Sequence, residues 1–187
     1  MIDVIVFTAS TALWALSEAW IGLRRRAPDR SRDAGTLSRL VLVIGGCVAL
    51  AAAVSLWPPA RAPDDWHPVL RWLGSAVMLT GMGFRWWSIR VLAEHFTVDV
   101  AIAADHRLIR SGPYRRLRHP SYTGLLLTVA GFLCALGSGL APLVIAWPLW
   151  AALRQRIRIE EAALSEAFPV DYPAYARTTR RLVPGVW

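Results

Sequence analysis

Hydrophobic residues form five long runs along the chain, separated by short polar segments. The runs cover about residues 2–23, 37–57, 68–92, 122–136 and 140–153. The first three are long enough for helices that cross the hydrocarbon of a bilayer, which takes about 20 residues. The last two are shorter, flank a Gly-Ser-Gly turn and are expected to form a tight helical hairpin. The pattern predicts an all-α integral membrane protein with about five transmembrane helices.

Several residues refine this picture. The run at 37–57 is rich in small residues, including Gly45 and Gly46, which favour close contact between membrane helices. Arg85 and Arg90 lie toward the far end of the third run, beside Trp86 and Trp87. Snorkelling Arg with Trp suggests that this end meets the membrane interface. Glu18 lies inside the first run, where either pairing with another helix or a functional role would explain a carboxylate.

The chain becomes polar again after residue 153. The helix of the fifth run is expected to continue to about residue 164, because charged residues follow there without a helix breaker. Asp171 is expected to cap a short helix that contains Tyr175.

Composition supports a membrane protein. The 187 residues are 55% hydrophobic with a mean hydropathy of +0.39, which is too apolar for an ordinary soluble domain. The formal charge is +8, and all 21 basic residues are Arg, a composition that looks prokaryotic. Because the Arg residues gather between the apolar runs, the expected partners are membrane lipids and not nucleic acid.

Loop charge predicts the orientation in the membrane. The segments at 24–39 and 106–119 and the C-terminal tail carry excess Arg, whereas the loop at 61–67 does not. Basic loops face the cytoplasm. We therefore expect the N-terminus outside, the C-terminus and both basic segments in the cytoplasm, and a location in a prokaryotic inner or cell membrane. The polar stretch and the tail then meet at one membrane face.

Side chains able to do chemistry gather in the stretch at 106–124, which holds five Arg among nineteen residues. Pro120 disfavours helix at the residue before it, so a helix begins just after His119. Free N–H groups at that helix start suit a ligand carboxylate, or His119 is simply a cap. Tyr114 follows a Gly-Pro turn and is either an interfacial anchor or part of a site.

A second group lies at the membrane exit of the last long helix. Arg156 and Glu160 are four residues apart and share one helix face. They form either a solvated ion pair or part of the same site. No metal site is expected, because the histidines have neither HxxxH nor HExxH spacing and no Cys is near them.

Five sequence blocks together resemble the isoprenylcysteine carboxyl methyltransferase family. The blocks, all in the family's order, are HRLIRSGPY at 106–114, RHPSYTG at 118–124, RIRIEE at 156–161, FPVDYPAY at 168–175 and RLVPG at 181–185. The resemblance covers roughly residues 68–187. Pro169 is a departure, since the family usually has Gly after the Phe.

The resemblance implies a single membrane domain with an N-terminal two-helix part at 1–67 and a catalytic methyltransferase core at 68–187. The cofactor implied is S-adenosyl-L-methionine, in a cytoplasmic pocket made by loops and C-terminal helices. The implied cofactor-binding residues are His106, Arg107, Leu108, Ile109, Tyr114, His119, Pro120, Ser121, Tyr122 and Glu160. Arg156 would bind the acceptor, and Arg156 and Glu160 would be the catalytic pair.

The expected acceptor is a lipophilic small molecule or lipid that enters from the bilayer. A carboxylate is favoured, and a phenol, a thiol or an amine also remains open. A carboxylate is already ionised at pH 7, so its methylation needs no general base. Three alternatives remain open: a phospholipid amine N-methyltransferase, an NADPH-dependent membrane reductase of related architecture, and a membrane scaffold without enzymatic activity.

Overall fold

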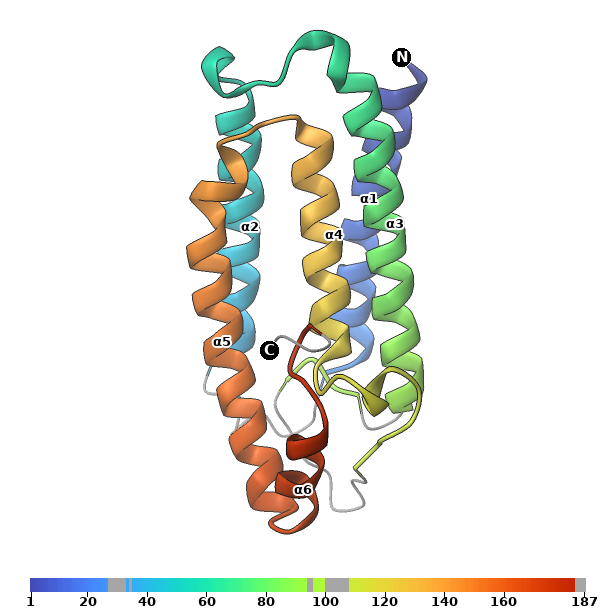
Figure 1. Cartoon of the computed structure of the whole chain (residues 1–187), viewed down its shortest axis with the longest axis vertical. Helices are drawn as coiled ribbons and strands as arrows, with labels where there is room; N and C mark the ends of the chain where they lie inside the picture. Colours follow the sequence, from blue (N-terminus) through green and yellow to red (C-terminus); the bar gives the residue numbers. More distant parts are fainter. Residues whose placement is uncertain (27–32, 34, 94–95, 100–107, 184–187) are drawn as a thin grey trace.

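The computed structural model describes residues 1–26, 33, 35–93, 96–99 and 108–183. These residues form an elongated helical bundle with no β-strand among them (Figure 1). The α-helices are α1 (Ile2–Arg24), α2 (Thr36–Ser55), α3 (His67–Leu92), α4 (Pro120–Leu136), α5 (Ala141–Ala167) and α6 (Asp171–Thr178). The short 3-10 helices are η2 (Pro58–Ala60), η3 (Asp64–Trp66) and η5 (Gly112–Arg115).

The five long helices lie where the hydrophobic runs predict them, and α5 continues through the polar residues after 153 as expected. The predicted cap of α6 is wrong. Val170 holds the N-cap position without a side-chain cap bond. Asp171 instead lies in the first turn, and its Oδ1 accepts a hydrogen bond from Arg110 at 2.8 Å. The Asp171 carboxylate, which the sequence predicts as the cap of α6, therefore pairs with the guanidinium of Arg110 from another segment.

The predicted α4–α5 hairpin is wrong as a packing unit. The two helices are joined by a short turn, but α4 packs along α3 while α5 packs along α2 (Figure 1). Glycines explain the preference for α3: a Cβ added at Gly131 would lie 2.5 Å from the carbonyl oxygen of Gly74. One added at Gly81 would lie 2.7 Å from the carbonyl oxygen of Gly124. Backbones this close need residues without side chains.

Small residues in α2 do not make the close contact predicted for them. A Cβ added at Gly45 or Gly46 would meet no heavy atom within 4 Å among the described residues. The close helix pair of this fold is α3 with α4, and α2 packs along α5.

The sides of the bundle are apolar and suit hydrocarbon. α1 and α2 are long and apolar enough to cross a membrane. Large exposed hydrophobic side chains lie on several helices, among them Leu16, Leu42, Val69, Leu143 and Trp147. Such an exposed surface is unusual for a soluble monomer of this size.

Polar segments gather at one end of the bundle. The polar stretch before α4 pairs with the tail after α6, as the sequence predicts. The N–H of Arg118 donates to the carbonyl of Arg180 at 2.7 Å, and the N–H of His119 donates to that of Arg181 at 3.0 Å. The N-terminus lies at the opposite end (Figure 1). This pairing fixes the start of α4 beside the polar half of α5.

Candidate active site

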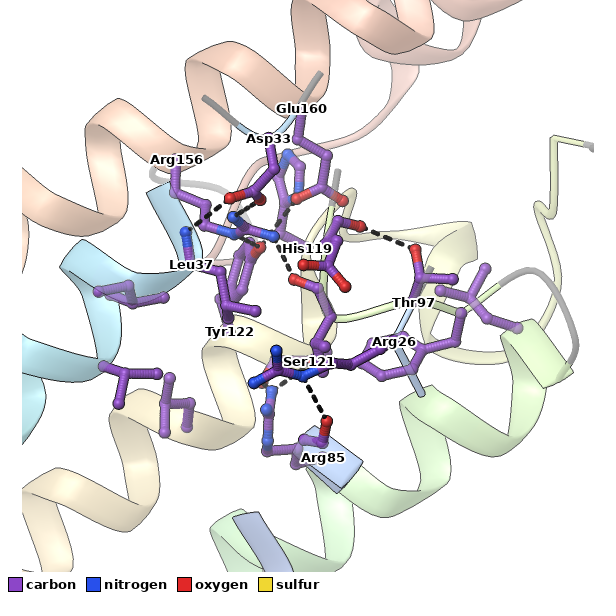
Figure 2. Close-up of a pocket in the computed structure, with 18 of the residues that line it drawn as sticks. Arg26, Asp33, Leu37, Arg85, Thr97, His119, Ser121, Tyr122, Arg156 and Glu160 are labelled. Carbon is purple, nitrogen blue, oxygen red and sulfur yellow. Dashed lines mark hydrogen bonds and ion pairs between the residues drawn. The ribbon is translucent and has the colours of Figure 1, made fainter. Parts of the chain in front are cut away.

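A cavity of about 960 Å³ opens at the polar end of the bundle. Figure 2 shows His119, Tyr122, Arg156 and Glu160 together around it. Apolar residues of α1 and α2 line another part of the same cavity: Ala19, Leu23, Leu37, Leu40, Val41 and Ile44. The cavity therefore joins a charged region to an apolar one.

His119 immediately precedes α4 and turns its ring toward α5. His119 holds the N-cap position, but its side chain makes no cap bond to the helix start, so capping does not explain the placement of its ring. The ring Nδ1 lies 3.7 Å from Oε2 of Glu160, and Nε2 lies 3.4 Å from Oε1 of Glu161. Pro120 at the first helical position fixes the backbone that makes this turn.

Tyr122 links Arg156 to Glu160. Nε of Arg156 donates to the Tyr122 hydroxyl at 3.0 Å, and the hydroxyl donates to Oε2 of Glu160 at 2.9 Å. The Tyr122 ring stacks on His119 with centroids 5.7 Å apart. Arg156 is only 2% exposed, so Arg156 and Glu160 are not a solvated surface pair. The helix face that the sequence predicts is part of a buried network.

Charge is stabilised within this network. Burial favours the neutral form of His119, but Glu160 and Glu161 raise its pKa above the ordinary value. Burial likewise opposes ionisation of Glu160, yet His119, Arg156 and the Tyr122 hydroxyl lower its pKa. The Glu160 side chain is 33% exposed, whereas that of His119 is 2% exposed. A ligand in the cavity would meet a carboxylate that is ionised at neutral pH.

Glu161 faces away from the cavity and fastens the C-terminal tail. It accepts hydrogen bonds from Nε of Arg118 at 2.9 Å and from Nη2 of Arg181 at 2.8 Å. Burial opposes its ionisation, but His119 and these two Arg hold its pKa well below the usual range. Neighbouring carboxylates on α5 therefore have different surroundings, one on the cavity and one in an ion-pair cluster.

Arg85 does not snorkel as predicted. It is buried on α3, where Nε and Nη2 donate to the two carboxylate oxygens of Glu18 on α1, at 2.7 and 2.9 Å. Nη1 donates to the Ser121 hydroxyl at 2.6 Å. All three residues line the cavity. The carboxylate of the first run is therefore a helix-pairing group that also lies on the site.

The remaining predicted site residues have different placements. Leu108, Ile109 and Tyr114 line the cavity together with Ser121. Pro120 is buried in the first turn of α4 and does not line it. The predictions for His106 and Arg107 fall outside the described residues.

The cavity wall also contains residues that the sequence did not predict for the site, among them Asp33, Arg85, Tyr172 and Tyr175. The two tyrosines lie in the block at 168–175 that carries part of the resemblance, so that block contained a usable signal. The Tyr175 hydroxyl donates to the carbonyl of Tyr114 at 2.7 Å and holds η5 against α6. No sequence block points to Asp33 or Arg85, because their ion-pair partners, Arg156 and Glu18, are far away in the sequence.

This arrangement can bind a ligand with both polar and apolar parts. It offers an ionised carboxylate, a buried guanidinium and several tyrosines beside an apolar wall. The described residues include no group of three or more His, Cys, Asp or Glu side chains placed to hold a metal ion.

Comparison with known proteins places these residues in a family context. The family model for the isoprenylcysteine carboxyl methyltransferase (ICMT) family matches residues 73–166. Protein-S-isoprenylcysteine O-methyltransferase A of Arabidopsis thaliana is 28% identical over 138 residues, covering 63% of this chain and 70% of that protein. The Dictyostelium discoideum protein-S-isoprenylcysteine O-methyltransferase is 29% identical over 119 residues, covering 63% of this chain and 50% of that protein.

A solved structure agrees with the sequence matches. The eukaryotic intramembrane Ras methyltransferase ICMT has a TM-score of 0.63 and 25% identity to this chain, covering 76% of this chain and 53% of that one. This chain thus spans only about half the length of the solved protein. The named methyltransferases above are eukaryotic and do not bear out the expected prokaryotic source. Since the family model matches half of the length of this chain, the chain belongs to the isoprenylcysteine carboxyl methyltransferase family.

Proposed function

We propose that this protein is a membrane methyltransferase that uses S-adenosylmethionine to methylate a carboxylate on a lipophilic acceptor. The observation that carries the proposal is the cavity itself, in which Glu160, Tyr122 and Arg156 meet an apolar wall from α1 and α2. Polar groups of this kind suit a charged cofactor, and the apolar wall suits the lipid part of an acceptor.

The residues present fit the cofactor. S-adenosylmethionine carries ribose hydroxyls, a purine and a charged amino-acid end. The ionised and partly exposed carboxylate of Glu160 can accept hydrogen bonds from hydroxyl or ammonium groups. Tyr114 and Tyr122 offer aromatic surface for a purine, and the segment Leu108 and Ile109 adds apolar surface and backbone polar groups.

The chemistry needs little from the protein beyond alignment. The bound cofactor supplies an electrophilic methyl group on a sulfonium. Arg156 remains positively charged, because Tyr122, Glu160 and Asp33 raise its pKa despite burial. It can therefore attract an ionised acceptor oxygen by a charge-assisted hydrogen bond. Because the Arg156 guanidinium is buried, an acceptor oxygen bound to it loses water and is held in one direction.

A phospholipid amine is a weaker acceptor candidate at this site. Methyl transfer to a neutral amine produces an ammonium cation, and the buried cation of Arg156 disfavours that charge beside it. The same cation favours an anionic acceptor. Oxygen methylation is accordingly the preferred reaction.

The proposed topology places all five long helices across the bilayer, with the N-terminus outside and the cavity at the cytoplasmic face. Two observations support it. The N-terminus lies at the end of the bundle opposite the polar segments (Figure 1). Described residues of the two segments rich in Arg, among them Arg26 and Arg118, line the cavity. Within this single membrane domain, residues 68–187 supply most of the site.

An acceptor comparison tests the proposal. Purified protein is incubated with methyl-labelled S-adenosylmethionine and either N-acetyl-S-farnesylcysteine, its carboxamide, or phosphatidylethanolamine in detergent. We expect label in the carboxylate as a base-labile ester and none in the amide. Transfer to phosphatidylethanolamine alone would establish the amine reaction instead. NADPH oxidation without methyl transfer would establish a reductase.

A further inference from the structure

The turn that begins α2 reaches the centre of the site through Asp33, which is 5% exposed. Its Oδ1 accepts a hydrogen bond from Nη1 of Arg156, and its Oδ2 accepts one from the N–H of Leu37 at 3.0 Å. The Thr36 hydroxyl lies 2.7 Å from the same Nη1 and also donates to the carbonyl of Asp33 at 2.8 Å. One nitrogen of the guanidinium is therefore held by two oxygens of a single turn.

The other nitrogens of Arg156 are also engaged. Nε donates to the Tyr122 hydroxyl, and Nη2 donates to the carbonyl of Val98. A guanidinium has five N–H groups. After these four hydrogen bonds, one N–H on Nη2 has no partner among the described residues. The plane of the guanidinium is thus fixed on three sides, and its charge is balanced by the carboxylate of Asp33.

We infer that Asp33, supported by Thr36, is a positioning residue for methyl transfer. It fixes the guanidinium of Arg156 so that the remaining N–H of Nη2 is presented to the acceptor oxygen. This inference rests on the proposed function and deepens it. It means that Arg156 contacts the acceptor carboxylate through one hydrogen bond. A two-point contact would need Nη2 together with Nη1 or Nε, but Asp33 and Thr36 occupy Nη1 and Tyr122 occupies Nε.

The inference also brings the N-terminal part of the chain into the site. Asp33 and Thr36 lie outside residues 73–166, the span that matches the family model. The same turn starts α2, whose residues Leu37, Leu40 and Val41 form part of the apolar wall. One turn thereby connects the surface proposed for the lipid with the group proposed for the carboxylate.

A second contact between α2 and α5 provides a matched control. Nη1 of Arg39 donates to Oε1 of Gln155 at 2.7 Å in an exposed position. This bond joins the same two helices one residue away from Arg156, yet neither side chain lines the cavity. If Asp33 only fastened α2 to α5, losing either contact would have a similar effect on turnover.

The experiment compares Asp33→Asn with Arg39→Ala. Asn keeps a carbonyl oxygen that can accept from the N–H of Leu37, while the charge is lost. Turnover of N-acetyl-S-farnesylcysteine is measured at saturating S-adenosylmethionine, and S-adenosylhomocysteine affinity is measured by calorimetry. For Asp33→Asn we expect kcat/KM for the acceptor to fall about 10- to 100-fold, with cofactor affinity within about twofold. Arg39→Ala should match wild type in both.

The outcomes separate this inference from the proposed function. A wild-type protein that does not methylate the carboxylate contradicts the proposed function. A wild type that does, with Asp33→Asn no worse than Arg39→Ala, overturns only the role of Asp33. In an Arg156→Gln background, Asp33→Asn should reduce the residual turnover no further. A further loss as large as the one that Asp33→Asn causes in the wild-type protein would also overturn the role of Asp33.

Thr36→Val keeps the inference testable if Asp33→Asn does not fold. It removes the second oxygen from Nη1 of Arg156. We expect the acceptor kcat/KM to fall about 3- to 10-fold with cofactor affinity retained. Unchanged acceptor kinetics in a folded Thr36→Val protein would contradict the positioning role.

Discussion

Glu160 and Glu161 are neighbours in sequence, yet the structure gives them opposite roles. The test is to replace each by Gln, which keeps the size and removes the charge. Glu161 is 14% exposed and accepts bonds from Arg118, Arg181 and the ring of His119. Glu160 lines the cavity and is 33% exposed. We therefore expect Glu161→Gln to lose stability and Glu160→Gln to lose cofactor affinity.

The magnitudes follow from these contacts. Breaking a buried ion pair by removing one partner costs about 3–5 kcal/mol. The partial exposure of Arg181, at 34%, and the oxygen that Gln retains reduce this to about 2–4 kcal/mol. For a chain of this size, that lowers the unfolding midpoint by about 5–15 °C. Glu160→Gln keeps an acceptor for Tyr122 and should change the free energy of unfolding by less than about 1 kcal/mol.

Two assays on each variant make the comparison. Thermal unfolding in detergent measures stability, and calorimetric titration with S-adenosylhomocysteine measures affinity. We expect Glu160→Gln to weaken binding about 10- to 100-fold, because charge-assisted hydrogen bonds to the ligand are lost. Folded Glu161→Gln should bind nearly as wild type does. Equal losses of stability and affinity in both variants would refute the separation of roles.

Three further predictions follow from packing, charge and hydrogen bonding. Gly131→Ala should destabilise the protein by about 1–3 kcal/mol, while Gly45→Ala should not, as unfolding midpoints would show. The pKa of His119 is raised above 6.5, so its stabilisation is complete below pH 6.5 and is lost as pH rises through the folded-state pKa; His119→Gln should flatten this dependence. Tyr175→Phe should cost about 1–2 kcal/mol in chemical denaturation, whereas Tyr172→Phe, whose hydroxyl has no partner among the described residues, should cost nothing measurable.

Local patterns predict the helices well, because the length of a hydrophobic run and the position of a helix breaker depend only on residues close together in the sequence. Pro120 predicted the start of α4, and the spacing of Arg156 and Glu160 predicted their shared face. The pairing of helices was not predictable in the same way. The sequence of α2 is richer in small residues, but the glycines that meet are those of α3 and α4. Close packing needs glycines that face each other, which no single segment reveals.

The missed site residues show the same limit. The Trp neighbours of Arg85 suggest a snorkelling side chain, yet its carboxylate partner Glu18 lies on another helix. Asp33 was one acidic residue in a basic loop, and its contact with Arg156 spans most of the chain. The family resemblance supplied residues of the core because those lie in contiguous blocks. It could not supply partners from the first two helices, where the chain matches only in being hydrophobic.

Binding of S-adenosylhomocysteine to the purified wild-type protein is the most direct test of the central claim, since every proposed role depends on that cofactor. Calorimetry in detergent should show one site per chain with micromolar affinity, and a titration with NADPH should give no binding heat. Absence of binding heat with S-adenosylhomocysteine in a protein that unfolds cooperatively would contradict the assignment of this cavity to the cofactor.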